Sequence, residues 1–352
     1  MQDISADLQS AVLDAIERAD PLSIHGNGSK SFYGREAQGR VLKVAEHSGI
    51  LHYEPTELVV TARCGTPLEF IESTLAGQGQ MLGFEPPHFG SSPTLGGAVA
   101  CGLSGPRRPF SGSARDFVLG CRIINGRGEI LSFGGEVMKN VAGYDLSRLM
   151  AGSLGTLAVI LEISLKVIPR PEIELTLQQE IGEREAIEKM NRWQGKALPI
   201  SALAWHRGAA YIRLSGGHHA VSAASRILGG EELENDGQFW NSLRDQRLPF
   251  FRQRGNLWRL ALAPAAPVIE LSGDWFYEWG GAQRWFVRED PAQTLFETAA
   301  EHGGHATLFR AVGNRDAVFQ PLPEEIARIQ KRVKKAFDPH GILNPGRMYP
   351  GW

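Results

Sequence analysis

Glycine-rich turns alternate with apolar strands through residues 85–171, and this stretch holds the residues best suited to chemistry. Glycine tolerates positive φ and leaves its N–H open, so successive amides can surround an anion. The diphosphate of a dinucleotide is such an anion. The glycine pattern therefore predicts a bound dinucleotide. Four segments make up this pattern, namely residues 93–98, 111–120, 139–145 and 152–157.

A further glycine loop follows the apolar strand predicted for residues 22–24. The amides of Gly26 and Gly28 could meet phosphate oxygens, and Ser29 adds a hydroxyl. A lone GxG is a weak signal, because a Rossmann site needs GxGxxG opening a helix and a later acidic residue. An ordinary glycine turn is the alternative interpretation.

Bulk composition excludes several classes of protein. The chain has 352 residues, a formal net charge of -2 and a pI near 6.6, which gives no basic surface for nucleic acid. Its length favours two domains. The three cysteines, Cys64, Cys101 and Cys121, are too widely spaced for a CxxC motif and cannot bind a four-thiolate iron–sulfur cluster by themselves. A reducing cytoplasm fits this cysteine usage, and no apolar run approaches a spanning helix.

The elements that position the glycine loops follow from local patterns. Thr66 to Glu69 read as a capping box with Pro67 at the first helical position. Two apolar runs around residues 125–128 predict an antiparallel hairpin. Alternating apolar residues predict one long strand over residues 156–168, which Pro169 ends.

The second half of the chain mixes short strand and helix candidates. Residues 172–320 therefore predict an α+β cap, with helix starts near His218 and a helix stop at Gly303. A tail helix is predicted over residues 323–337, because acidic residues open it and lysines close it. Its expected buried face consists of Ile326, Ile329, Val333 and Phe337.

The four glycine segments, together with the tail motif of residues 337–347, resemble the FAD domain of the vanillyl-alcohol oxidase type, also called the p-cresol methylhydroxylase type. The resemblance is to its branch of FAD-linked hydroxy-acid dehydrogenases. It implies an α+β fold with an FAD-binding domain at residues 1–171, a reduced cap at residues 172–320, and a tail at residues 321–352 that returns to the first domain.

The resemblance also implies the cofactor and its contacts. FAD would be held non-covalently, because His25 stands at the start of the loop rather than at the usual attachment position. Arg115 and Asp116 could equally form a structural ion pair, and the side chains of Val159 and Ile160 could be ordinary core. The expected cofactor-binding residues are His25, Gly26, Asn27, Gly28, Ser29, Lys30, Thr94, Gly96, Gly97, Ser111, Gly112, Ser113, Arg115, Asp116, Gly155, Val159 and Ile160.

A hydroxy-acid substrate needs a cation for its carboxylate, and Arg259 is the expected catalytic cation. Asn344 is the second expected catalytic residue, because the resemblance implies that its tail motif lies close to the flavin and the substrate. Arg284 and Arg310 are further candidates, with Trp258, Trp279 and Trp285 as walls, although each tryptophan fits a core position equally well. Metal-binding relatives carry an acid-rich motif in their cap, which this chain lacks, so no metal is expected.

The resemblance implies an oxidoreductase for small 2-hydroxy acids, with glycolate as the expected substrate and D-lactate as a second one. Hydride would pass to FAD, and electrons would leave to a complex containing a second FAD-linked oxidase subunit and an iron–sulfur subunit. The complex would be cytoplasmic and would reach the inner membrane only through partners. Two alternatives remain, an FAD-bearing subunit that only relays electrons or supports assembly, and a UDP-sugar enolpyruvyl reductase using NADPH.

Overall fold

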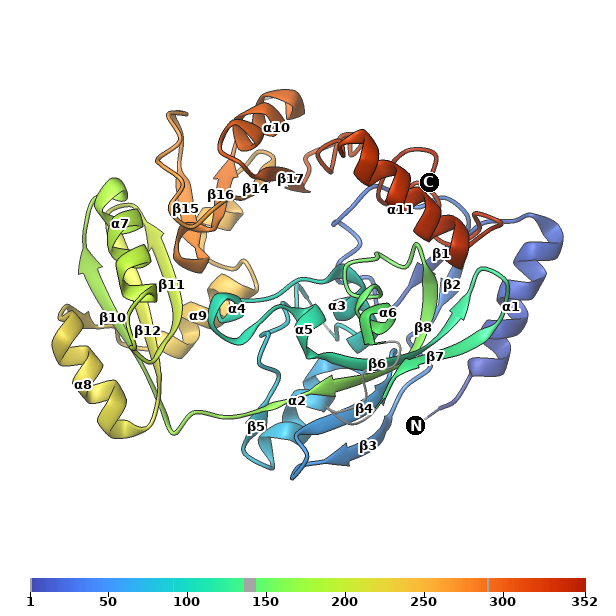
Figure 1. Ribbon diagram of the computed structural model, residues 1–352, viewed down its shortest axis with the longest axis horizontal. Helices are drawn as coiled ribbons and strands as arrows, with labels where there is room; N and C mark the ends of the chain where they lie inside the picture. Colours follow the sequence, from blue (N-terminus) through green and yellow to red (C-terminus); the bar gives the residue numbers. More distant parts are fainter. Residues whose placement is uncertain (1, 91, 136–143, 290) are drawn as a thin grey trace. The chain divides into compact units, whose positions relative to one another are not determined.

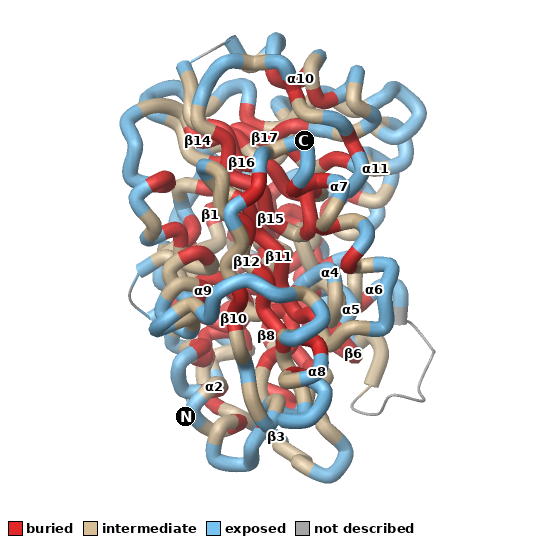
Figure 2. The backbone as a smooth tube through the Cα atoms, turned by 90° about the vertical axis from the view of Figure 1, so that its left-hand side faces the viewer, coloured by how far each residue is buried: buried red, intermediate tan, exposed pale blue. Residues whose placement is uncertain are grey.

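The computed structural model describes residues 2–90, 92–135, 144–289 and 291–352. The chain forms two compact units. Unit 1 comprises Met1–Ser104, Gly112–Arg170 and Pro321–Trp352, and unit 2 comprises Gly105–Ser111 and Pro171–Gln320. Buried residues concentrate on the strands within each unit (Figure 2). Both units combine helices with sheets, which confirms the predicted α+β class.

Unit 1 is built on a five-stranded antiparallel sheet with the order β3-β4-β8-β6-β7. β6 and β7 form the predicted hairpin, and Asn125 closes its turn by accepting the N–H groups of Arg127 and Glu129 at 2.9 and 3.0 Å. The predicted long strand is also confirmed as β8. The strands are β3 (Ile50–Glu54), β4 (Val59–Arg63), β6 (Val118–Asn125), β7 (Ile130–Gly134) and β8 (Ala158–Lys166).

Smaller elements complete unit 1. β1 (Leu22–His25) pairs in parallel with β2 (Arg40–Lys43), and β5 (Gln80–Met81) pairs with β9 (Ile168–Pro169). Apolar side chains of the sheet and of the longer helices share one core. The helices are α1 (Ser5–Arg18), α2 (Leu68–Ala76), α3 (Leu95–Cys101), α5 (Ala114–Phe117), α6 (Tyr144–Arg148) and α11 (Glu324–Phe337).

Unit 2 is built on an eight-stranded sheet with the order β13-β10-β12-β11-β15-β16-β14-β17 (Figure 1). Its strands are β10 (Ile173–Glu180), β11 (Ile200–His206), β12 (Ala209–Gly216), β13 (Glu231–Glu232), β14 (Leu257–Ala261), β15 (Trp275–Glu278), β16 (Gln283–Val287) and β17 (His305–Arg310). Its helices are α4 (Arg108–Ser111), α7 (Glu183–Gln194), α8 (His218–Leu228), α9 (Asp236–Arg244), α10 (Ala292–Glu301) and the short η1 (Pro249–Arg252) and η2 (Trp279–Gly281).

Two details of the predicted helices in unit 2 are confirmed. α8 begins at His218, and α10 ends before Gly303, after which β17 starts at His305. Trp258 and Trp285 are buried core residues. None of the helices in the described ranges has the length and apolar character needed to cross a membrane.

The predicted capping box at the start of α2 is wrong. The helix begins at Leu68, and Pro67 occupies the position before it with no side-chain cap. The hydroxyl of Thr66 instead accepts the N–H of Gly49 at 2.9 Å and donates to the carbonyl of Arg63 at 2.7 Å. A distant backbone donor therefore replaces the local cap that the sequence favours.

The tail helix α11 is confirmed, but its predicted buried face is wrong. Ile326 and Ile329 are 44% and 56% exposed, and Val333 and Phe337 are half-buried. Lys334 is the buried residue of this helix, at 9% exposure. A charged side chain at such a position must have found polar partners, because an isolated buried ammonium group is costly.

Those partners join the tail to the rest of unit 1. The ammonium group of Lys334 donates to the carboxylate of Asp338 at 2.6 Å and to the carbonyls of Thr156 and Leu343 at 2.7 and 2.9 Å. Burial lowers the pKa of Lys334, and the charge of Asp338 opposes that shift. The same carboxylate accepts the N–H groups of Ile342 and Leu343. The chain after α11 also meets β1, since Leu343 forms a parallel bridge with Leu22, although these residues lie at opposite ends of the sequence.

We expect Lys334→Met to lower the free energy of unfolding of unit 1 by about 3–5 kcal/mol, because the Asp338 carboxylate would remain buried without its counter-charge. Urea unfolding of the purified protein measures this loss. The matched control is Lys335→Met, which removes a lysine from the next, exposed position of the same helix. Equal stability of the two variants would contradict the assigned role of the buried pair.

Candidate functional site

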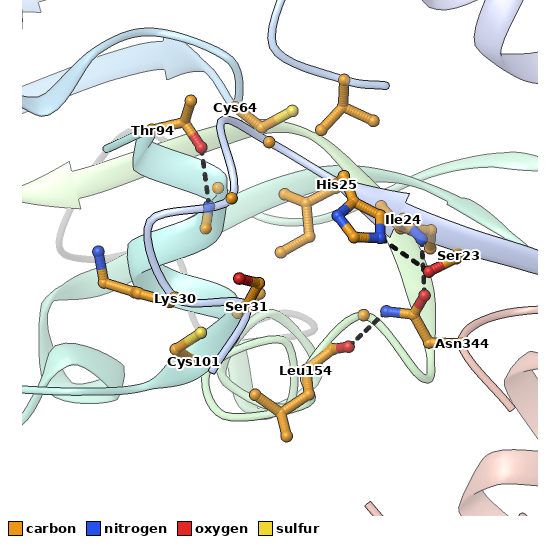
Figure 3. Close-up of a pocket in the computed structure, with 18 of the residues that line it drawn as sticks. Ser23, Ile24, His25, Lys30, Ser31, Cys64, Thr94, Cys101, Leu154 and Asn344 are labelled. Carbon is orange, nitrogen blue, oxygen red and sulfur yellow. Dashed lines mark hydrogen bonds between the residues drawn. The ribbon is translucent and has the colours of Figure 1, made fainter. Parts of the chain in front are cut away.

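A cavity in unit 1 lies where β1, the loop after it, the start of α3, the start of β8 and the tail converge (Figure 3). All of its lining residues belong to unit 1. They are Ser23, Ile24, His25, Gly26, Asn27, Gly28, Ser29, Lys30, Ser31, Ala37, Val44, Cys64, Thr94, Gly96, Gly97, Ala100, Cys101, Leu154, Gly155, Ala158, Ile160, Asn344 and Arg347.

The cavity brings together most of the residues expected from the sequence. The six residues of the first loop line it, from His25 to Lys30, as do Thr94, Gly96, Gly97, Gly155, Ile160 and Asn344. Val159 does not, because it alternates with Ala158 and Ile160 on β8 and its side chain is fully buried in the core. Residues 139–143 of the third glycine segment lie outside the described residues.

The segment around Ser111 does not line the cavity. Ser111 ends α4 in unit 2. Gly112, Ser113, Arg115 and Asp116 surround the start of α5, where the carboxylate of Asp116 accepts the N–H and hydroxyl of Ser113 at 2.8 and 2.7 Å. The acidic residue therefore forms a capping box, which is the local structure that this spacing favours.

The first loop presents backbone donors to the cavity. Within the described parts of the chain, the N–H groups of Gly26, Asn27, Gly28 and Ser29 have no hydrogen-bond acceptor. The side chain of Asn27 donates to the carbonyl of Ser92 at 2.8 Å and thereby fixes the loop against the segment before α3. Four successive open amides form the kind of concavity that binds anionic oxygens.

The glycines at the start of α3 have different physical roles. A Cβ on Gly96 would lie 2.6 Å from the Cβ of Cys64, so Gly96 is required for packing of α3 against β4. A Cβ on Gly97 would meet only the hydroxyl of Thr94, at 3.1 Å. That hydroxyl caps the helix by accepting the N–H of Gly97. Because Gly97 has no side chain, the start of α3 leaves space in the cavity at this position.

Asn344 connects three segments at the cavity wall. Its amide oxygen accepts the N–H of Ile24 at 2.6 Å, and its amide nitrogen donates to the carbonyl of Leu154 at 2.6 Å (Figure 3). Gly155 has a φ of +71°, and a Cβ there would lie 2.7 Å from the same amide nitrogen. The polar atoms of Asn344 therefore position the wall through backbone contacts.

The cavity wall carries positive charge. Lys30 is 6% exposed, and Arg347 reaches the lining from the tail. Among the described lining residues, none is an Asp or Glu. Burial lowers the pKa of His25, and the charge of Arg347 lowers it further, so the imidazole is neutral near pH 7. Open amides, two cations and a glycine-lined opening together fit a diphosphate group.

Two thiols also line the cavity. Burial raises the pKa of Cys64 to about 12, and burial raises the pKa of Cys101 although the charges of Lys30 and Arg347 oppose that shift. Both are therefore protonated at neutral pH and are weak nucleophiles. Cys64, Cys101, Ser31 and Leu154 were not among the expected site residues, although Leu154 lies within the glycine segment of residues 152–157.

The expected substrate cation, Arg259, lies on β14 in unit 2, where its guanidinium stacks over the ring of Phe309 at 5.5 Å. Arg284 is fully buried and donates to the carbonyls of Gly281, Pro267 and Ala266. Arg310 donates to the carbonyl of Phe251 and the side chain of Gln246. Arg284 therefore holds the cap together. No cluster of three metal-ligating side chains occurs among the described residues.

Comparison with protein families gives two matches. Residues 4–134 match a model described as an FAD binding domain, and residues 289–348 match one described as the C-terminal domain of FAD linked oxidases. The first match contains the loop and the start of α3, and the second contains Asn344 and Arg347. The matched models therefore show that this chain has an FAD-binding domain.

Comparison with individual proteins gives relatives of the same kind. The chain is 52% identical over 347 residues to glycolate oxidase subunit GlcE of Escherichia coli, covering 99% of this chain and 98% of that one. It is 32% identical to a D-lactate dehydrogenase of Archaeoglobus fulgidus, covering 96% and 88% of the two chains. The crystal structure of p-cresol methylhydroxylase with substrate bound shares the fold, with a TM-score of 0.73, 15% identity and coverage of 98% and 87%.

Replacing Gly97 with leucine should abolish FAD retention while the protein still folds, because the new side chain would extend into the cavity from a position with little other contact. The ratio of flavin absorbance to protein in the purified variant measures this. Gly237→Leu on α9 is the control, since a Cβ there meets nothing within 4 Å. A folded Gly97→Leu protein with stoichiometric FAD would disprove the location of the site.

Proposed function

This chain belongs to the FAD-linked oxidase family, together with glycolate oxidase subunit GlcE, and on that premise we propose that it is the FAD-binding subunit of a glycolate-oxidising complex. Near-complete coverage of both chains at 52% identity is the observation that carries the proposal. The resemblance seen in the sequence was to the same kind of subunit. D-lactate is a second candidate substrate, supported by the name of the Archaeoglobus relative.

The described residues account for retention of FAD without a covalent bond. The open amides from Gly26 to Ser29 and the cations at the wall would hold the diphosphate. Nε2 of His25 lies 2.8 Å from the hydroxyl of Ser23, and the cavity thiols are protonated. Protonated thiols are weak nucleophiles, which favours non-covalent binding. Bound FAD would supply a two-electron acceptor for hydride.

Substrate oxidation by this chain also needs a group that binds the substrate carboxylate. We keep Arg259 as the candidate, because it is half-buried on β14 and its guanidinium lies over the ring of Phe309. Asn344 would act by positioning the wall beside FAD, since its oxygen and nitrogen already bind Ile24 and Leu154.

Electrons would leave this chain through partner subunits. A second relative at 42% identity over 84 residues is glycolate oxidase subunit GlcD of Bacillus subtilis, which covers 24% of this chain. We propose a complex of this chain with a second FAD-linked oxidase subunit and an iron–sulfur subunit. The complex would lie in the cytoplasm, attached to the inner membrane only through its partners.

A second function deserves a direct test, namely a subunit that carries FAD but only relays electrons or supports assembly. The observation that favours it is the lack of a metal-ligating cluster among the described residues, since a base or metal must assist removal of the hydroxyl proton. Under this alternative, the longer FAD-linked subunit would oxidise the substrate.

Absorbance of the purified single chain, recorded anaerobically before and after glycolate is added, separates these functions. We expect an FAD spectrum that bleaches, because the substrate would reduce the flavin directly. A flavin that stays oxidised with both glycolate and D-lactate, yet is reduced when the whole complex is present, would refute substrate oxidation by this chain and assign it to relay. Dithionite serves as the positive control for reducibility.

A further inference from the structure

Arg347 holds the far arm of the first glycine loop in place. Its guanidinium donates to the carbonyls of Arg35 at 2.6 Å, Tyr33 at 2.7 Å and Ser31 at 3.4 Å. In return, the N–H of Arg35 donates to the carbonyl of Arg347 at 3.0 Å, and its side chain donates to the carbonyl of Gly346 at 3.1 Å. The tail and the loop are therefore locked by contacts in both directions.

The charge of this guanidinium acts inside the cavity. Arg347 lines the cavity wall, and its hydrogen bonds to the carbonyls of Arg35, Tyr33 and Ser31 orient the guanidinium. Its field lowers the pKa of His25 on one wall and opposes the rise in the pKa of Cys101 on another. A fixed positive charge that reaches both walls is well placed to act on an anion between them.

The same side chain limits how the loop can move. The loop leaves β1 where Asn344 binds the N–H of Ile24, and it returns through Ser31 and Tyr33, which Arg347 binds. The four open amides lie between these two attachments. Fixing both ends of the loop keeps the amides oriented before any ligand arrives, so less entropy is lost on binding.

We propose that Arg347 is a cofactor-binding residue of the FAD site, supplying fixed positive charge to the diphosphate and holding the loop whose amides receive it. The inference rests on the assignment of the cavity to FAD. It adds a second residue of the tail, beside Asn344, to the walls of the cavity.

Arg347→Met and Arg347→Lys test the two parts of this role. Arg347→Met should weaken FAD binding on the order of 10- to 100-fold, the range for loss of a charged hydrogen-bonding group. Arg347→Lys should recover part of the affinity, because it keeps the charge and loses the fork that spans several carbonyls. Quenching of flavin fluorescence on titration of the flavin-free protein measures each dissociation constant.

Binding of fragments of FAD shows which part of the cofactor interacts with Arg347. Binding of ADP, which carries the diphosphate without the flavin, should weaken in Arg347→Met by a factor similar to that for FAD. Riboflavin, which has no phosphate, should bind the variant and the parent protein equally. The control is Arg328→Met, which removes a cation of the same tail whose side chain is 66% exposed.

The outcomes distinguish failure of this inference from failure of the FAD assignment. If the parent protein binds neither FAD nor ADP, the assignment of the cavity fails. If it binds FAD and Arg347→Met binds FAD and ADP equally well, the inference is overturned. If Arg347→Met does not fold, Arg347→Lys and the salt dependence of parental FAD binding decide, because a charge-based contact must weaken as salt rises. The inference is also overturned if neither Arg347→Lys nor added salt changes the affinity for FAD.

Discussion

Strand β1 pairs with β2 and also shares hydrogen bonds with a tail more than 300 residues away in sequence. The N–H of Leu22 donates to the carbonyl of Ile342 at 2.7 Å, the N–H of Asn344 donates to the carbonyl of Leu22 at 2.9 Å, and the side chain of Asn344 takes the N–H of Ile24. Buried backbone groups need such partners, so β1 and the tail must form together. The buried pair of Lys334 and Asp338 keeps the tail in position for these contacts.

The position of the glycine loop follows from that arrangement. Since the loop starts at the end of β1, docking of the tail on that strand fixes where the loop begins. Arg347 then binds the returning arm of the loop. The same docking brings a cation into a wall whose described lining residues include no carboxylate. The contacts that dock the tail on β1 therefore also shape the wall of the cavity.

Local sequence patterns predicted much of this structure. The hairpin at Asn125, the long strand β8 and the tail helix were all readable, because turn chemistry and periodicity act over a few residues. The cap at Thr66 and the buried face of α11 were wrong, because a distant donor at Gly49 and a buried ion pair at Lys334 override local preference. Such long-range contacts leave no local signal.

Sequence patterns likewise predicted some residues of the candidate site and missed others. Gly26 and Gly97 stand in recognisable motifs, and both line the cavity. The contribution of Arg347 was missed, since nothing in its neighbourhood says which carbonyls it will bind. Because ligand binding to the folded state alone stabilises that state, FAD should also stabilise docking of the tail. Docking of the tail and binding of FAD are then coupled equilibria, and each is expected to stabilise the other.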